Sequence, residues 1–203
     1  DNAGTDYGSV YIIYGETLSS AHATMTAKYA DVAIDGTTTS SWCDDEAGQY
    51  YGESFSIAGV GDINGDGYDD LAVGDPMTSS RDGALYVFLG AASHIAATSL
   101  TQADATASET EYEYLGARVG AAGDVNGDGY GDILVAYYGD TSGVRLIQGG
   151  SSLSGNVDAS TVSLANWSYH AMAYFFRSGP LGDINGDGYD DVIVTNSGYY
   201  SYG

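Results

Sequence analysis

The sequence is organised around a nine-residue acidic string that occurs three times. The string reads Asp-Ile/Val-Asn-Gly-Asp-Gly-Tyr-Asp/Gly-Asp and begins at positions 62, 124 and 183, so the copies start 62 and 59 residues apart. Each copy runs directly into a short apolar stretch, at residues 71–73, 133–135 and 192–194. A fixed period of this kind indicates an architecture of repeated units, each of which buries its apolar face against its neighbours.

A second repeated signature, an apolar segment bounded by glycine, alternates with the acidic string. Its copies occupy residues 8–15, 83–90 and 143–149, and the longer first interval predicts an insertion loop at about residues 37–50, where Thr, Ser and acidic residues collect. Small and apolar residues precede each acidic string, and a Thr/Ala-rich segment such as 96–107 follows the glycine-bounded one. Each period therefore predicts four strands: the acidic string is the turn between the first two, and the Thr/Ala-rich segment is a weaker outer strand.

Four strands in about 60 residues favour an all-β fold of β-propeller blades, although a usual blade is shorter, at roughly 40 to 50 residues. A β-sandwich and a β-solenoid are the less favoured alternatives, because sandwiches do not repeat internally and solenoid turns are shorter. Both signatures occur three times, so residues 1–203 form a single propeller segment of about three four-stranded blade equivalents. Since propellers typically have about 4 to 8 blades, we expect an incomplete ring unless the segment is assembled.

The two ends of the sequence are complementary fragments of one blade. The chain begins just ahead of a glycine-bounded segment and stops just after an acidic string and its apolar stretch. Two interpretations stay open. The segment belongs to a longer chain, or it self-associates, with the C-terminal strands of one copy completing the N-terminal strands of the next. Such head-to-tail contacts give a closed ring or an open filament, and two chains would supply six blades.

The acidic string also provides a set of oxygen donors. Oxygen-bearing side chains stand at relative positions 1, 3, 5 and 9, and the backbone carbonyl of position 7 is free to join them. Several carboxylates without His or thiolate favour Ca²⁺ over Zn²⁺ or Cu²⁺, and a flexible glycine-rich loop suits Ca²⁺ better than Mg²⁺. Position 12 is Val rather than the bidentate Glu of an EF-hand. The alternative is a solvated Asp-Gly hairpin turn, against which the retention of every donor in three copies argues.

These motifs resemble FG-GAP repeats, the blades of the integrin α-subunit β-propeller and of its bacterial and fungal relatives. The best copy has Tyr51-Gly52, the acidic string from Asp62 to Asp70, Gly-Asp-Pro ending at Pro76 and the segment 83–90, in the family's order. Later copies depart from the pattern, with Leu115-Gly116 and Phe175-Phe176 where Phe-Gly is usual. The resemblance covers essentially the whole chain and implies three Ca²⁺ sites, with position 7 contributing its carbonyl. The implied ligands are Asp62, Asn64, Asp66, Tyr68 and Asp70; Asp124, Asn126, Asp128, Tyr130 and Asp132; and Asp183, Asn185, Asp187, Tyr189 and Asp191.

Composition excludes several other functions. With 28 Asp+Glu against 5 Lys+Arg the formal net charge is −23, which disfavours nucleic acid and anionic membrane surfaces as partners. No apolar run approaches the roughly 18 residues of a membrane-spanning helix, so membrane insertion is not expected. A single Cys43 excludes an internal disulfide framework. The three histidines, His22, His94 and His170, lack metal-site spacing, and no nucleophile elbow or phosphate loop is present, so we predict no enzyme activity.

Together these features predict a non-catalytic, extracellular or cell-surface, calcium-binding β-propeller. We expect it to act in cell adhesion or as a structural subunit of a surface or filamentous assembly. Extracellular placement follows from the availability of Ca²⁺ outside cells and from the acidic composition. Two other functions stay open: a lectin-like module that binds glycans, for which Trp42 and the Tyr clusters are the only indication, and an accessory domain of a larger secreted enzyme.

Overall fold

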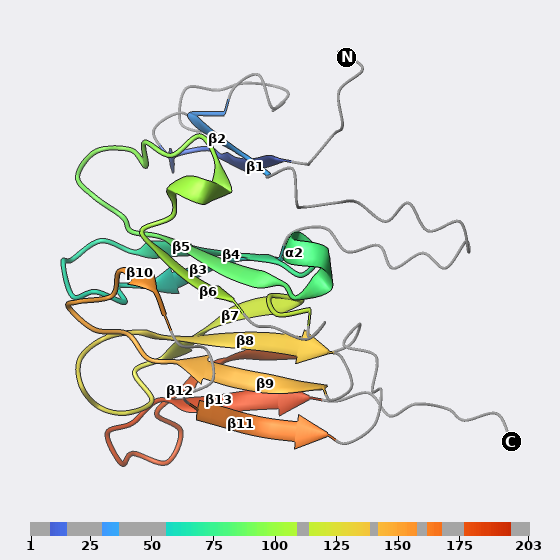
Figure 1. The fold of residues 1–203 in the computed structure, drawn as a ribbon. Coiled ribbons are helices and arrows are strands. Elements are labelled where there is room, and N and C mark those ends of the chain that lie inside the picture. The colour runs from blue at the N-terminus through green and yellow to red at the C-terminus, as the bar shows by residue number, and fades with distance from the viewer. Residues whose placement is uncertain are drawn as a thin grey trace, which may run out of the picture.

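The computed structural model describes residues 9–15, 30–36, 56–108, 114–138, 142–157, 162–167 and 177–195. Within them the chain forms antiparallel sheets that follow one another in chain order and stack face to face (Figure 1). The predicted insertion at 37–50, with Trp42 and Cys43, lies outside the described residues. Among the described helices, none is long and apolar enough to cross a membrane.

Two sheets are complete blades. The first contains β3 (Ser56–Gly61), β4 (Asp70–Asp75), β5 (Ala84–Phe88) and β6 (Ala105–Ser108), and the second contains β7 (Arg118–Gly123), β8 (Asp132–Tyr138), β9 (Ser142–Ile147) and β11 (Val162–Trp167). In both, neighbouring strands pair antiparallel in the order predicted from the repeats. The expected all-β blade architecture is therefore confirmed.

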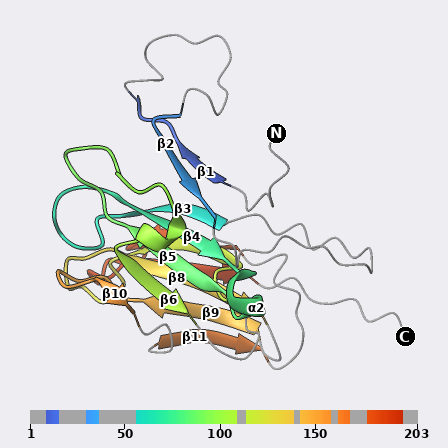
Figure 2. The ribbon, with the colours of Figure 1, turned by 45° about the horizontal axis from the view of Figure 1, so that its top comes forward.

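The ends of the described chain carry two half-blades. A glycine-bounded strand, β1 (Ser9–Ile12), pairs with β2 (Val32–Asp35), and the hairpin β12 (Arg177–Gly182) and β13 (Asp191–Thr195) surrounds the last acidic loop. By position in the repeat, β1–β2 is the outer half of a blade and β12–β13 is the inner half. Figure 2 shows β1 and β2 at the end of the stack opposite β11. The described sheets do not close into a ring.

Hydrophobic cores lie between consecutive sheets because side chains alternate along each strand. In β5 all five residues are buried: Leu85 and Val87 face the following blade, whereas Ala84, Tyr86 and Phe88 face the preceding half-blade. A third cluster, centred on Leu134 and Leu146, packs against Val192 and Val194 of β13. Each of the two complete blades thus contributes to an apolar core on both of its faces.

Three features differ from the sequence-based expectation. The segment 96–107 was predicted as one outer strand, but it forms a 3₁₀ turn, η2 (Leu100–Gln102), before the short strand β6. A single helical turn, α2 (Thr78–Arg81), connects β4 to β5. A two-residue strand, β10 (Gly155–Asn156), adds to β6 in parallel, so the first blade gains a fifth strand from the segment that follows β9.

Candidate metal-binding loops

The three acidic strings form the hairpin loops that join the first two strands of successive blades. They connect β3 to β4, β7 to β8 and β12 to β13, and they lie on the same side of the stack, at the left in Figure 1. Each loop has the same two glycines in the left-handed region; in the first these are Gly65, with φ 77°, and Gly67, with φ 92°. A residue with a Cβ adopts this conformation at a cost, which explains the positions of Gly in the string.

The first Asp of each string organises its loop by accepting backbone amides. Oδ1 of Asp62 accepts the N–H groups of Gly65, at 2.7 Å, and of Asp66, at 3.0 Å, while Oδ2 accepts that of Gly67 at 2.8 Å. Asp124 and Asp183 make the same three contacts in their own loops. Hydrogen bonds from the N–H of Gly188 and from further amides of the loop lower the pKa of Asp183 below its ordinary value. Partial desolvation of the carboxylate opposes this change.

The third and fifth positions bring an amide and a carboxylate together. In the first loop, Nδ2 of Asn64 donates to Oδ2 of Asp66 at 2.9 Å, and Oδ1 of Asn64 accepts the Asp66 N–H at 3.0 Å. The other Asp66 oxygen accepts the N–H of Tyr68 at 3.0 Å. The second and third loops repeat this arrangement, with Asn126 beside Asp128 and Asn185 beside Asp187. The local structure is therefore a property of the string itself.

The last Asp of the string lies beneath the loop. Asp70 is buried, and its carboxylate accepts the N–H of Ile63 at 2.9 Å and that of Gly90, two residues after the end of β5, at 2.6 Å. Burial raises the pKa of Asp70; the two amides oppose this change, and the charges of Asp66 and Asp62 reinforce it. The electrostatic influence among these three carboxylates shows that the loop concentrates negative charge.

The second loop repeats this buried position, and the third loop does so in part. Asp132 accepts the N–H groups of Val125 and Gly149, and its pKa is raised by burial in the same way. In the third loop, Asp191 accepts the N–H of Ile184 at 2.9 Å, and no second amide of the described residues donates to it. The sequence-based prediction missed Gly90 and Gly149 as parts of the site. Their recurrence as the last residue of two glycine-bounded segments was the sequence signal that could have identified them.

The donors present in the loops suit a hard divalent cation. Asp and Asn oxygens and backbone carbonyls are the ligands that Ca²⁺ takes, and the strings contain no Lys or Arg to neutralise the carboxylates. In the described part of the chain, however, no group of three or more His, Cys, Asp or Glu side chains is arranged to hold a metal ion. In the first loop, Asp62 accepts three backbone amides and Asp70 accepts the amides of Ile63 and Gly90. The oxygen donors of the string also include the Asn side chain at position 3 and the backbone carbonyl at position 7.

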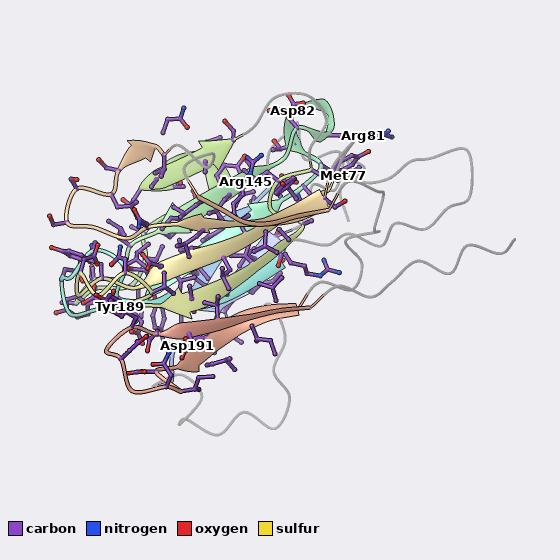
Figure 3. All side chains as sticks on the ribbon, turned by 90° about the horizontal axis from the view of Figure 1, so that it is seen from below. Met77, Arg81, Asp82, Arg145, Tyr189 and Asp191 are labelled. Atoms are coloured by element: carbon purple, nitrogen blue, oxygen red, sulfur yellow. The ribbon has the colours of Figure 1, made fainter. Side chains whose placement is uncertain are left out.

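The structure brings the predicted ligand side chains of each string into one loop. Figure 3 shows Tyr189 of the third loop beside the second loop, and Asp191 at the start of β13. Of the three histidines, the structure describes His94, whose ring stacks on that of Tyr14 with the ring centroids 4.0 Å apart. His22 and His170 lie outside the described residues.

Stacked antiparallel sheets, three of which begin with a hairpin that carries an acidic loop, define the chain as a segment of a repeat-built β-propeller. The model of the FG-GAP repeat matches residues 55–88, 116–164 and 175–203, which is more than half of the chain. The chain therefore belongs to the FG-GAP repeat family, and the resemblance seen in its sequence is confirmed.

Among curated proteins the chain is similar to integrin α subunits. It is 27% identical to human integrin alpha-11 over 68% of the chain, 32% identical to Xenopus laevis integrin alpha-5 over 74%, and 29% identical to human integrin alpha-8 over 80%. The matched stretches make up 10%, 15% and 16% of these relatives. The chain thus spans about a sixth or less of their length.

Proposed function

We propose that the chain is a non-catalytic, calcium-binding β-propeller module that acts outside the cell, in adhesion or as a structural subunit of a surface assembly. One observation carries the proposal: three loops, about 60 residues apart, repeat the same oxygen donors and the same amide contacts. The similarity to integrin α subunits supports the adhesion role and the extracellular location. The blades of the present chain supply a scaffold whose loops can present a binding surface.

In each loop the ion would be held by the side chains at positions 1, 3, 5 and 9 and the carbonyl at position 7. For the first loop these are Asp62, Asn64, Asp66, Asp70 and Tyr68. A carboxylate has about four lone-pair positions, so Asp62 can accept three amides and still offer an oxygen. Bound Ca²⁺ would neutralise charge that otherwise repels across the hairpin. The protein's own part is to hold the oxygens near one another through the amides of Gly65 and Gly67.

Calcium stoichiometry tests the proposal directly. Equilibrium dialysis or isothermal titration calorimetry should give three bound Ca²⁺ per chain, one for each loop. Asp66→Asn should reduce this number to two, because it removes a carboxylate from the donor set. Asp69→Asn is the matched control: it makes the same charge change at an exposed neighbouring position outside the donor set, so it should keep three. Three ions on Asp66→Asn, or none on the unaltered chain, would contradict the proposal.

Thermal unfolding gives a second readout. A ligand that binds only the folded chain stabilises it by about 2.7 kcal/mol per site at a hundredfold excess over Kd. Excess EGTA should therefore lower the melting temperature strongly, and Ca²⁺ added beyond the chelator should restore it. A melting curve that does not change in EGTA would argue against a structural role for the ion.

A further inference from the structure

The exposed apolar side chains of the described residues gather at the two ends of the stack. Seven large ones are exposed: one on β1, two on the first complete blade and four on the last hairpin. Leu181, Ile184 and Ile193 lie on the last hairpin, and we call them the C-terminal face. Tyr11, Ile57 and Tyr68 lie on β1 and on the first complete blade, and we call them the N-terminal face. The seventh, Tyr189, packs against the second loop and belongs to neither face.

The C-terminal face occupies positions that are covered in the other blades. Val60, Ile63 and Ala72 of the first blade lie at the equivalent positions, and all three are at most 1% exposed beneath the second blade. Their counterparts in the second blade, Ala122, Val125 and Leu134, belong to or pack against the core shared with β13. On the last hairpin, by contrast, Leu181 is 44% exposed, Ile184 70% and Ile193 46%. This face therefore has the composition of an interface between blades.

Polar contacts between consecutive loops show what the third loop lacks. The carbonyl of Asp62 accepts the N–H of Gly131 at 3.0 Å, and that of Asp124 accepts the N–H of Asp190 at 2.9 Å. In both cases the loop that donates also lays a Tyr over a glycine: a Cβ at Gly65 would lie 2.6 Å from Cε1 of Tyr130.

The same packing occurs once more and then stops. A Cβ at Gly127 would lie 2.8 Å from Cε1 of Tyr189, whereas nothing lies within 4 Å of such an atom at Gly186. No described amide donates to the carbonyl of Asp183. Among the described residues, the third loop therefore lacks the Tyr contact and the amide contact that the first two loops receive.

The N-terminal face presents the missing complement. Tyr68 and Asp69 form the same corner as Tyr189 and Asp190, and Tyr68 is exposed. Ile57 is paired with Val73, which packs toward β1–β2, so Ile57 points to the same side of the blade, and among the described residues it is exposed there.

Gly15 ends β1's glycine-bounded segment as Gly90 and Gly149 end theirs. Gly90 and Gly149 donate to Asp70 and Asp132 and are crowded by the neighbouring acidic loop, whereas nothing lies within 4 Å of a Cβ at Gly15. In both complete blades, the glycine at this position donates its N–H to the last Asp of the acidic string. Gly15 and Asp191 are the equivalent residues of the two half-blades, and the described residues do not bring them together.

We propose that the N-terminal face of a second copy of this chain docks on the C-terminal face, with β1 of that copy pairing antiparallel to β13. The registers of β4–β5 and β8–β9, carried to these strands, place Ile193 opposite Ile12 and Val194 opposite Tyr11. The N–H of the second copy's Gly15 then donates to Asp191, and its Tyr68 covers Gly186.

A second copy is the occupant because the two faces lie at opposite ends of the stack and match each other by repeat position (Figure 1). The interface deepens the assembly role proposed above and rests on it. Two copies would close a ring of six blades if the rotation closes, and further copies would extend a filament if it does not.

Solution mass tests the interface. Light scattering on the calcium-loaded chain should give at least twice the 21.0 kDa of one copy. Ile193→Asp places a charge on the C-terminal face and should return the mass to that of one copy. Ser152→Asp adds the same charge at the exposed turn between β9 and β10 and should leave the assembly intact. A monomeric unaltered chain, or an Ile193→Asp variant that still assembles, would overturn the proposal.

Disulfide trapping tests the register without relying on a disruptive variant. In a Cys43→Ser background, Ile12→Cys with Ile193→Cys should form a cross-link between copies under mild oxidation, because directly opposed strand residues satisfy disulfide geometry. Tyr11→Cys with Val192→Cys is displaced by two residues and should cross-link far less. Equal yields from the two pairs, or none from the first, would overturn the register. A monomer that binds three Ca²⁺ refutes only the interface, whereas an assembly that binds none refutes only the calcium proposal.

Discussion

At the scale of single residues, glycine decides how closely the first two blades approach. A Cβ on Gly74 of β4 would lie 2.8 Å from the backbone carbon of Gly116, which itself has φ 90°. Backbone atoms cannot move aside as the end of a flexible side chain can. Gly74 is therefore fixed by the contact between blades rather than by the conformation of its own strand.

Gly74→Ala should lower the free energy of unfolding by about 1–3 kcal/mol, the usual cost of overpacking. Gly59→Ala is the matched control, because a Cβ there has nothing within 4 Å and its φ is not left-handed. This second substitution should be neutral or stabilise by up to about 1 kcal/mol, since it reduces the entropy of the unfolded chain. Urea denaturation of both variants provides the comparison, and equal effects would contradict the close approach.

At the scale of elements, the first two acidic loops each insert an apolar side chain between neighbouring blades. Ile63 leaves the first loop and is fully buried in the core that the first blade shares with the second. Val125, at the same position of the second loop, is only half-buried against the third cluster. The loop is thereby anchored from below by an apolar side chain and from above by amide contacts to Asp62.

Ile63→Ala should cost about 2–5 kcal/mol, as expected for truncation of a fully buried aliphatic side chain. Val125→Ala should cost less, because fewer methyl groups are lost from a site that is already partly open. Chemical denaturation, with both variants measured in the same calcium concentration, gives the order. A smaller loss for Ile63 than for Val125 would contradict this insertion between blades.

The elements that the sequence predicts well are those with a repeated local signal. Glycine-bounded apolar segments became β1, β5 and β9, and the acidic strings became hairpin loops, since the string itself determines its turns and amide contacts. The parallel strand β10 is not predicted from the sequence because Gly155 and Asn156 have little strand propensity. The strand is held by two backbone hydrogen bonds, from the N–H of Gly155 to the carbonyl of Asp104 and from the N–H of Val157 to the carbonyl of Thr106.

The site shows the same limit. Sequence spacing identifies the acidic residues of each string, but the hydrogen bond from the N–H of Gly90 to the carboxylate of Asp70 joins residues that are 20 apart in the sequence. That bond depends on how β5 packs beside β4, which is a property of the sheet. Likewise, α2 is a single turn of four residues, too short for an apolar period to reveal it.

At the scale of the whole molecule, the high net negative charge opposes compaction. The chain carries 28 acidic against 5 basic residues, and three of its acidic clusters lie on one side of the stack. Self-repulsion of a high net charge destabilises a compact state, and salt weakens it because the Debye length falls from about 10 Å at 0.1 M to about 3 Å at 1 M. Three bound Ca²⁺ would act on the same repulsion, but locally and with six positive charges.

Salt and calcium should therefore substitute for one another. In EGTA, raising NaCl from about 0.05 M to about 0.5 M should increase the melting temperature, because screening relieves repulsion within the folded chain more than in the expanded one. In saturating Ca²⁺ the same change should have a much smaller effect, since the closest carboxylates are already neutralised. Calorimetry across both series provides the measurement. A melting temperature that falls with NaCl in EGTA would mean that attractive ion pairs outweigh repulsion, and the proposed need for a cation in each loop would lose its electrostatic basis.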